Sequence, residues 1–125
     1  MMNKKRPKHL ALHTISLPLP GLVSIFHRVS GILLFLALPL LLWMLQASLR
    51  SIVTYTQLLE VLKSPLSKVL LLGLAWAFLH HFLAGIRYLA LDFHIGSSLA
   101  QARFSSKLVF GSSLLLTVLT GVWLC

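Results

Sequence analysis

Three long apolar runs dominate the pattern of hydrophobic and polar positions along the chain. They extend over about Leu22–Leu49, Pro65–Leu91 and Lys107–Leu124. Each run is long enough to cross the hydrocarbon core of a bilayer, which takes about 17 to 25 helical residues. The pattern predicts an all-α integral membrane protein, with a cytoplasmic N-terminal segment at 1–21 and a three-helix transmembrane domain at 22–125.

Proline, serine and glycine positions refine these elements. Pro39 lies inside the first run and predicts a kink there. Ser64 and Pro65 predict the start of the second helix, because serine caps helices and proline is tolerated in the first turn. Residues 92–100 and 50–64 are expected to be connecting loops. The proline-punctuated lead is not expected to form a long helix, and its segment His9–Leu19 is expected to lie along the membrane surface.

Composition and charge agree with a membrane protein. Of all residues, 58% are apolar and 10% are charged, whereas about a quarter of the residues of a soluble domain are charged. The formal net charge is +9, and the basic residues lie at the ends of the apolar runs, as expected of loops that face anionic headgroups. Nucleic-acid binding is disfavoured, because it requires a basic face on a folded soluble module. The single cysteine, Cys125, excludes an intrachain disulfide and a cysteine-based metal site.

The distribution of Lys and Arg predicts the orientation in the membrane. The N-terminal lead carries four such residues, and the loop between the second and third helices carries Arg103, bordered by Arg87 and Lys107. The other connection is longer and includes the acidic Glu60. Its basic residues are spread over a longer stretch and are Arg50, Lys63 and Lys68. We therefore expect a bacterial inner-membrane protein with a cytoplasmic N-terminus and a periplasmic C-terminus.

Ionisable residues at membrane depth are costly and therefore indicate functional sites. Near the start of the first helix, Ser24, His27, Arg28 and Gly31 share one face by their spacing. An arginine on that face can hold an anion, and a serine hydroxyl can hydrogen-bond to a carbonyl oxygen. The alternative is that Arg28 reaches the lipid headgroups and His27 lies at the interface.

A second cluster lies near the end of the second helix and contains His80, His81, Arg87 and Asp92. His80 and His81 point about 100° apart. His81 belongs to a series of mostly small residues that lets a helix or a flat macrocycle approach: Gly73, Ala77, His81 and Gly85. His80 shares its face of the helix with Trp76, Ala84 and Arg87. The sequence leaves open whether this face is turned to lipid or to protein.

We favour His81 as a haem ligand, because haem iron takes imidazole as an axial ligand. Arg87 lies about 9 Å further along the helix, at roughly 1.5 Å per residue, near the water boundary where haem propionates would point. The alternative for either histidine is an interhelical hydrogen bond. The second axial ligand is either His27 or a residue of a partner chain. We favour the partner, because three helices enclose a haem only in part.

Two stretches carry a resemblance to a known family. The stretch Ser24–Gly31, SIFHRVSG, and the stretch His81–Asp92, HFLAGIRYLALD, resemble the signatures of the cytochrome b556 subunits of succinate dehydrogenase. The lead from Arg6 to Pro20 and the three-helix layout are similar to that family as well. The resemblance covers essentially the whole chain. The two motifs, found together at this separation, are highly specific for the family.

The resemblance implies the large membrane anchor of complex II, succinate:quinone oxidoreductase. It implies a helical bundle around haem b with a second anchor subunit, one axial histidine coming from each, and association with an iron–sulfur and a flavoprotein subunit. His81 matches the haem ligand, and Ser24 and Arg28 match residues that bind ubiquinone. The haem and quinone vicinity includes His27, Arg87, Tyr88 and Asp92. Succinate chemistry is expected on other subunits, since this chain carries no residue for it.

Two positions depart from the family pattern. Tyr88 stands where histidine is common, and His80 stands where an aromatic or apolar residue is common. Two other functions remain open: an anchor of a quinol:fumarate reductase, and a small transporter or scaffold without a cofactor. Redox spectra separate the transporter from the haem protein. The trimer of heterotetramers is one assembly that the resemblance allows.

Overall fold

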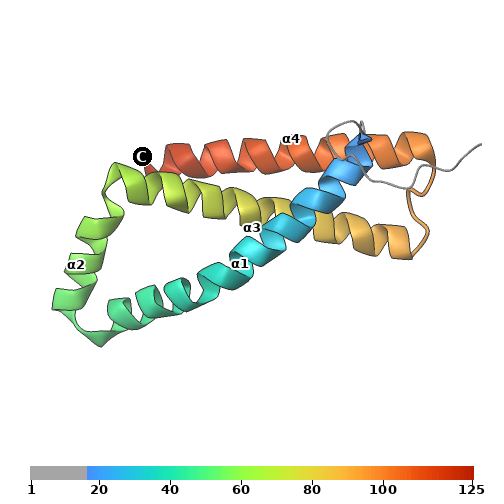
Figure 1. Cartoon of the computed structure of the whole chain (residues 1–125). Helices are drawn as coiled ribbons and strands as arrows, with labels where there is room; N and C mark the ends of the chain where they lie inside the picture. Colours follow the sequence, from blue (N-terminus) through green and yellow to red (C-terminus); the bar gives the residue numbers. More distant parts are fainter. Residues whose placement is uncertain (1–16) are drawn as a thin grey trace, which may run out of the picture.

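The computed structural model describes residues 17–125, and these form four helices (Figure 1). The helices are α1 (Leu19–Arg50), α2 (Ile52–Leu62), α3 (Pro65–Asp92) and α4 (Leu99–Leu124). The three long helices α1, α3 and α4 have the length and apolar composition to cross a membrane. The prediction of an all-α protein with three spanning helices is therefore confirmed. The expected surface segment falls largely outside the described residues.

Helix α1 starts three residues before the expected position and continues to Arg50. Pro18 occupies the N-cap position and Pro20 lies in the first turn. Backbone N–H groups in the first turn have no partner within the helix, so a proline there costs no helical hydrogen bond. Pro39 lies inside the helix as expected, and α1 curves along its length in Figure 1. An internal proline removes one backbone hydrogen bond, which favours such bending.

The connection at 50–64 contains a helix that the sequence analysis read as loop. α2 begins directly after Ser51, whose hydroxyl accepts a hydrogen bond from the Thr54 amide at 3.1 Å, while the Thr54 hydroxyl accepts one from the Ser51 amide at 3.2 Å. This reciprocal cap satisfies backbone donors at the start of the helix. The helix has 11 residues, too few to cross a bilayer, so a search for spanning segments passes over it.

The third spanning helix begins at Leu99 instead of 107. Ser98 caps it, with its hydroxyl accepting a hydrogen bond from the Gln101 amide at 3.3 Å. The first three turns hold Gln101, Arg103 and Lys107, so hydropathy places the start too late. The turn before α4 contains Gly96 at φ 73°, a left-handed conformation that glycine adopts without strain.

Helix α3 packs against both α1 and α4, and α1 crosses α3 and then diverges from it toward α2 (Figure 1). The buried positions are mostly small, which lets the helix backbones approach closely. They include Ser30 on α1, Ala77 and Ala84 on α3, and Ser106 and Ser113 on α4. The buried serine hydroxyls donate to carbonyls of their own helices, so they lie in the interface without unpaired donors.

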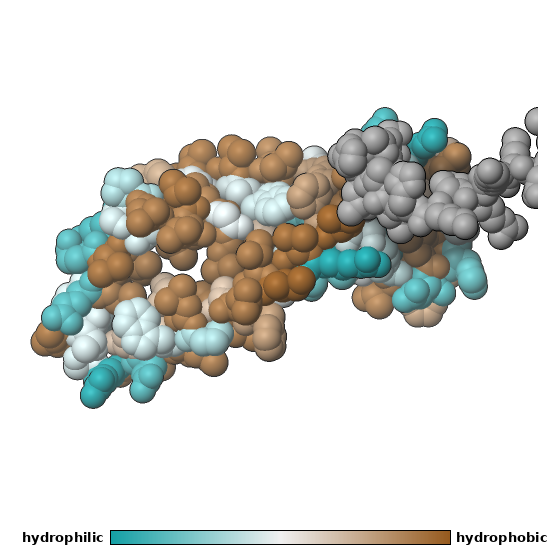
Figure 2. Space-filling view, viewed as in Figure 1, coloured by the Kyte–Doolittle hydropathy of each residue, from teal (hydrophilic) through white to brown (hydrophobic). Residues whose placement is uncertain are grey.

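The outer surface of the bundle is largely apolar. Figure 2 shows hydrophobic residues along the helices and hydrophilic residues mainly toward the two ends of the long axis. Large side chains such as Phe35, Leu42 and Phe104 are mostly exposed in the isolated chain. A contiguous apolar surface of this kind is suited to lipid and to partner helices.

Candidate functional site

The crossing of α1 and α3 brings His27 and His81 together. Their rings stack with centroids 4.3 Å apart and planes within 2° of each other. Tyr88, two turns after His81 on α3, meets the His27 ring edge-on at 5.1 Å. The two histidines that the sequence analysis placed in separate clusters therefore form one aromatic group.

His81 is fixed by the backbone of α1. Its Nδ1 lies 3.0 Å from the carbonyl oxygen of His27 and 3.4 Å from the hydroxyl of Ser30. A carbonyl only accepts hydrogen bonds, so Nδ1 carries the proton in this contact and Nε2 is left with a free lone pair. Histidines that bind metals commonly donate their other N–H to a carbonyl or carboxylate in this way.

Gly31 makes this close approach possible. A Cβ atom at this position would lie 3.0 Å from Cε1 and 3.3 Å from Nδ1 of His81, tighter than ordinary van der Waals contact. Gly31 therefore lets the imidazole ring lie directly against α1. The sequence pattern places Gly31 on the functional face, but it does not indicate that Ser30 and Gly31 contact His81.

An open groove of about 420 Å³ borders the two histidines on the surface of α1 and α3. Gly85 lies one turn after His81 on the same side of α3 and leaves this wall flat. The groove is mainly apolar, with Asp92 at the water-facing end of α3. Its lining consists of His27, His81, Phe82, Gly85, Ile86, Tyr88, Leu89 and Asp92.

Arg87 does not line this groove. Its Nε donates to the hydroxyl of Ser105 on α4 at 2.9 Å, and its guanidinium also reaches the Ala102 carbonyl at 3.5 Å. The guanidinium lies 5.5 Å from the centre of the Tyr88 ring, within range of a cation–π interaction. Arg87 therefore links α3 to α4 and contacts the groove through Tyr88.

His80 points into the bundle, which settles that its face is turned to protein. It is fully buried among the rings of Trp76, Phe26 and Phe110, with centroids 5.2 to 6.0 Å away. Within residues 17–125, neither of its ring nitrogens has a hydrogen-bond partner. His80 has no open space beside it for a large ligand, whereas His81 borders the groove.

Ser24 and Arg28 lie one turn apart on α1, at the end of the helix that carries His27. Ser24 is half-buried and Arg28 is exposed. Both side chains are thus accessible at the surface of this chain. The structure brings together His27, His81, Tyr88 and Asp92 at the groove, with Ser24 and Arg28 on the neighbouring turn of α1.

The sequence of this chain is similar to those of known proteins. Residues 2–120 match the family of succinate dehydrogenase/fumarate reductase transmembrane subunits. The chain is 36% identical over 124 residues to the succinate dehydrogenase cytochrome b556 subunit of Coxiella burnetii, covering 98% of this chain and 99% of that one. It is 35% identical over 115 residues to the subunit of the same name from Paracoccus denitrificans, covering 92% and 88%. The resemblance drawn from the two motifs is confirmed: the chain belongs to the succinate dehydrogenase/fumarate reductase transmembrane subunit family.

Proposed function

We propose that this chain is the membrane anchor of a bacterial succinate:quinone oxidoreductase that ligates haem b through His81 and contributes Ser24 and Arg28 to the quinone site. The observation that carries the proposal is the hydrogen bond from His81 Nδ1 to the His27 carbonyl. It orients the ring and leaves Nε2 free to bind iron, and His81 borders the groove. Relatives named cytochrome b556 subunits support the presence of a haem.

The groove fits a flat macrocycle bound to one histidine of this chain. Gly85 leaves the wall beside His81 without a side chain, and most of the lining is apolar. His27 does not suit the role of a second haem ligand, because its ring stacks in parallel on the His81 ring at 4.3 Å and leaves no room for a macrocycle between the two. We therefore assign the second ligand to the other anchor subunit.

The quinone site would use the neighbouring turn of α1. The Ser24 hydroxyl donates a hydrogen bond to a carbonyl oxygen of ubiquinone, and the Arg28 guanidinium stabilises negative charge that develops on that oxygen during reduction. Haem b, when bound, supplies a one-electron carrier beside this site. Asp92 lies exposed at the end of α3, where water can deliver protons.

The remaining subunits supply the rest of the reaction. A flavoprotein subunit oxidises succinate, and an iron–sulfur subunit passes electrons to the anchor. We place the end of the chain that carries Arg28, Asp92 and Arg103 at the cytoplasmic surface, in line with the bias of basic residues. There, electrons from soluble subunits and protons from water reach the same quinone.

The neighbouring histidines supply the test of the haem ligand. The purified complex with His81→Leu should lose the haem b absorption spectrum, while His80→Leu should keep it, because His80 lies in an apolar ring cluster without hydrogen bonds. Succinate oxidation by an artificial dye verifies that each variant complex is assembled. An unchanged spectrum in His81→Leu would overturn the ligand assignment, as would loss of the spectrum in His80→Leu alone.

A further inference from the structure

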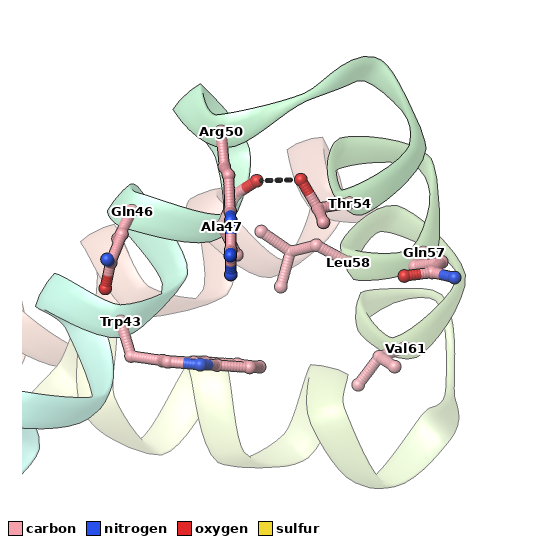
Figure 3. Close-up of a pocket in the computed structure, with 8 residues that line it drawn as sticks. All are labelled: Trp43, Gln46, Ala47, Arg50, Thr54, Gln57, Leu58 and Val61. Carbon is pink, nitrogen blue, oxygen red and sulfur yellow. Dashed lines mark hydrogen bonds between the residues drawn. The ribbon is translucent and has the colours of Figure 1, made fainter.

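A second polar pocket lies at the corner between α1 and α2, at the end of the bundle away from the histidine groove (Figure 3). About 33 Å of helix separates Arg28 from Arg50, at roughly 1.5 Å per residue. This length is close to the hydrocarbon thickness of about 30 Å, so the two arginines mark opposite boundaries of the membrane. The corner pocket therefore lies at the level of the lipid headgroups on the side opposite the quinone site.

Hydrogen bonds between the two helices hold the pocket in shape. The Thr54 hydroxyl donates to the Ala47 carbonyl at 2.7 Å, which ties the start of α2 to the last turns of α1. Leu58 of α2 is buried and closes the pocket between the helices. Figure 3 shows the Arg50 side chain extending along the pocket toward the Trp43 ring. The pocket is an open surface cavity of about 220 Å³, and the exposed Arg50 side chain lies along it.

The pocket is positively charged and is therefore suited to an anion. Within the described part of the chain, Arg50 takes part in no ion pair, and the one ion pair joins Lys63 to Glu60 at 2.6 Å. With that pair neutral overall, Arg50 and Lys68 leave this end of the bundle positive. Gln46 and Gln57 line the pocket as well, and their amides can donate to or accept from hydroxyl groups.

An apolar groove lies in the space where α1 and α3 diverge, and it shares no lining residue with the corner pocket. It has a volume of about 500 Å³ and touches α1 at Met44, one residue from Trp43 of the pocket. Its lining on α3 includes Leu70 and Leu74. A cationic pocket at headgroup level, followed along α1 by a mainly apolar groove within the membrane, matches a molecule with an anionic head and hydrocarbon chains long enough to reach from one to the other.

We propose that this corner binds an anionic phospholipid of the phosphatidylglycerol type. The phosphate pairs with the guanidinium of Arg50, the glycerol hydroxyls contact Gln46 and Gln57, and an acyl chain follows the apolar groove between α1 and α3. A zwitterionic lipid is less well matched, because its ammonium group would meet the positive end of the bundle. This lipid site is independent of the haem and quinone proposal.

The test measures lipid retained by the purified complex. The complex is washed extensively in detergent, and phosphatidylglycerol is quantified by mass spectrometry relative to protein. The wild-type complex should retain it, and Arg50→Gln should lower the retained amount by about fivefold, the scale expected for one basic residue facing anionic lipid. Arg103→Gln, which removes an exposed charge at the other end of the bundle, should retain the wild-type amount.

A second variant and a crosslinking probe complete the test. Gln57→Trp fills the pocket from α2 without removing the charge, and it should also release the lipid. A benzophenone amino acid at Gln46 should become crosslinked to phosphatidylglycerol. Wild-type retention in both pocket variants, equal loss in Arg103→Gln, or crosslinking to a partner polypeptide would each overturn the proposal.

Discussion

At the scale of single residues, two adjacent histidines have opposite surroundings. His80 is fully buried among aromatic rings and has no hydrogen bond within residues 17–125. His81 is partly exposed, borders a groove and is held at Nδ1 by the backbone of α1. The helical angle between neighbours, about 100°, is enough to separate a packing residue from a ligand candidate. The small-residue series favours His81 over His80 as the ligand, and this assignment stays a prediction; the carbonyl partner of His81 is visible only in the structure.

Gly31 gives a prediction about how the ligand is held. Gly31→Ala places a Cβ 3.0 Å from the His81 ring and forces the ring to move. We expect haem affinity to fall by about tenfold, as for other changes that disturb the orientation of a metal ligand. The measurement is the haem-to-protein ratio of the purified complex after dialysis. Gly111→Ala is the control, since its Cβ would meet no atom within 4 Å, and equal haem loss in both variants would contradict the argument.

Ser24 and Arg28 give a prediction for quinone chemistry. Arg28→Leu should lower quinone reduction by about 100-fold, because it removes stabilisation of developing negative charge. Ser24→Ala should lower it by about tenfold through the loss of one hydrogen bond. Both complexes should oxidise succinate normally with an artificial dye as acceptor. Equal loss in the quinone and dye assays would indicate misassembly instead of a damaged quinone site.

At the scale of elements, the sequence predicted the spanning helices well and their polar extensions poorly. Hydropathy located α3 to within one residue, because Ser64 and Pro65 mark its start clearly. It missed α2, which is apolar but has only 11 residues, and it missed the first turns of α4, which carry polar residues such as Gln101 and Arg103. These segments are specified by serine caps and by packing against neighbouring helices. Hydropathy averaged over a stretch of sequence detects neither the caps nor the packing. The crossing that joins His27 to His81 is likewise a tertiary property.

The cap of α2 leads to a prediction at this scale. Thr54→Val keeps the shape of the side chain but removes its bonds to the Ser51 amide and the Ala47 carbonyl. Loss of a helix cap costs about 1 to 2 kcal/mol, so amide hydrogen exchange in α2 should become about tenfold faster. Thr56→Val is the matched control, because the Thr56 hydroxyl bonds to the Val53 carbonyl of its own helix. Similar exchange in both variants would show that the cap does not hold the corner.

At the scale of the whole molecule, the bundle is closed at one end and open at the other. α1 lies against α3 near His27 and diverges from it toward α2 (Figure 1). Near the α2 end, α4 contacts α3, where a Cβ on Gly121 would lie 3.1 Å from Leu72. The groove beside the histidines and the wide space between α1 and α3 leave surfaces that helices of a second anchor subunit and lipid can cover.

The orientation of this bundle can be measured with the single cysteine. Cys125 is exposed at the end of α4, and an N-terminus in the cytoplasm places it in the periplasm after three spans. A membrane-impermeant maleimide should therefore label this chain in intact spheroplasts. A Cys125→Ser variant that also carries Ser97→Cys, in the turn before α4, should be labelled only after the membrane is opened. The reverse pattern would invert the proposed topology.

The bond between His81 and α1 ends on a main-chain oxygen, and this has a consequence for sequence variation. Every residue type supplies that carbonyl, so the orientation of the imidazole tolerates change at position 27 as long as the helix persists. A proline at position 31 is the exception, because its ring clashes with the carbonyl four residues earlier. The bond that orients His81 thus depends on the helix backbone and on the glycine at position 31, and not on the chemistry of the side chain at position 27.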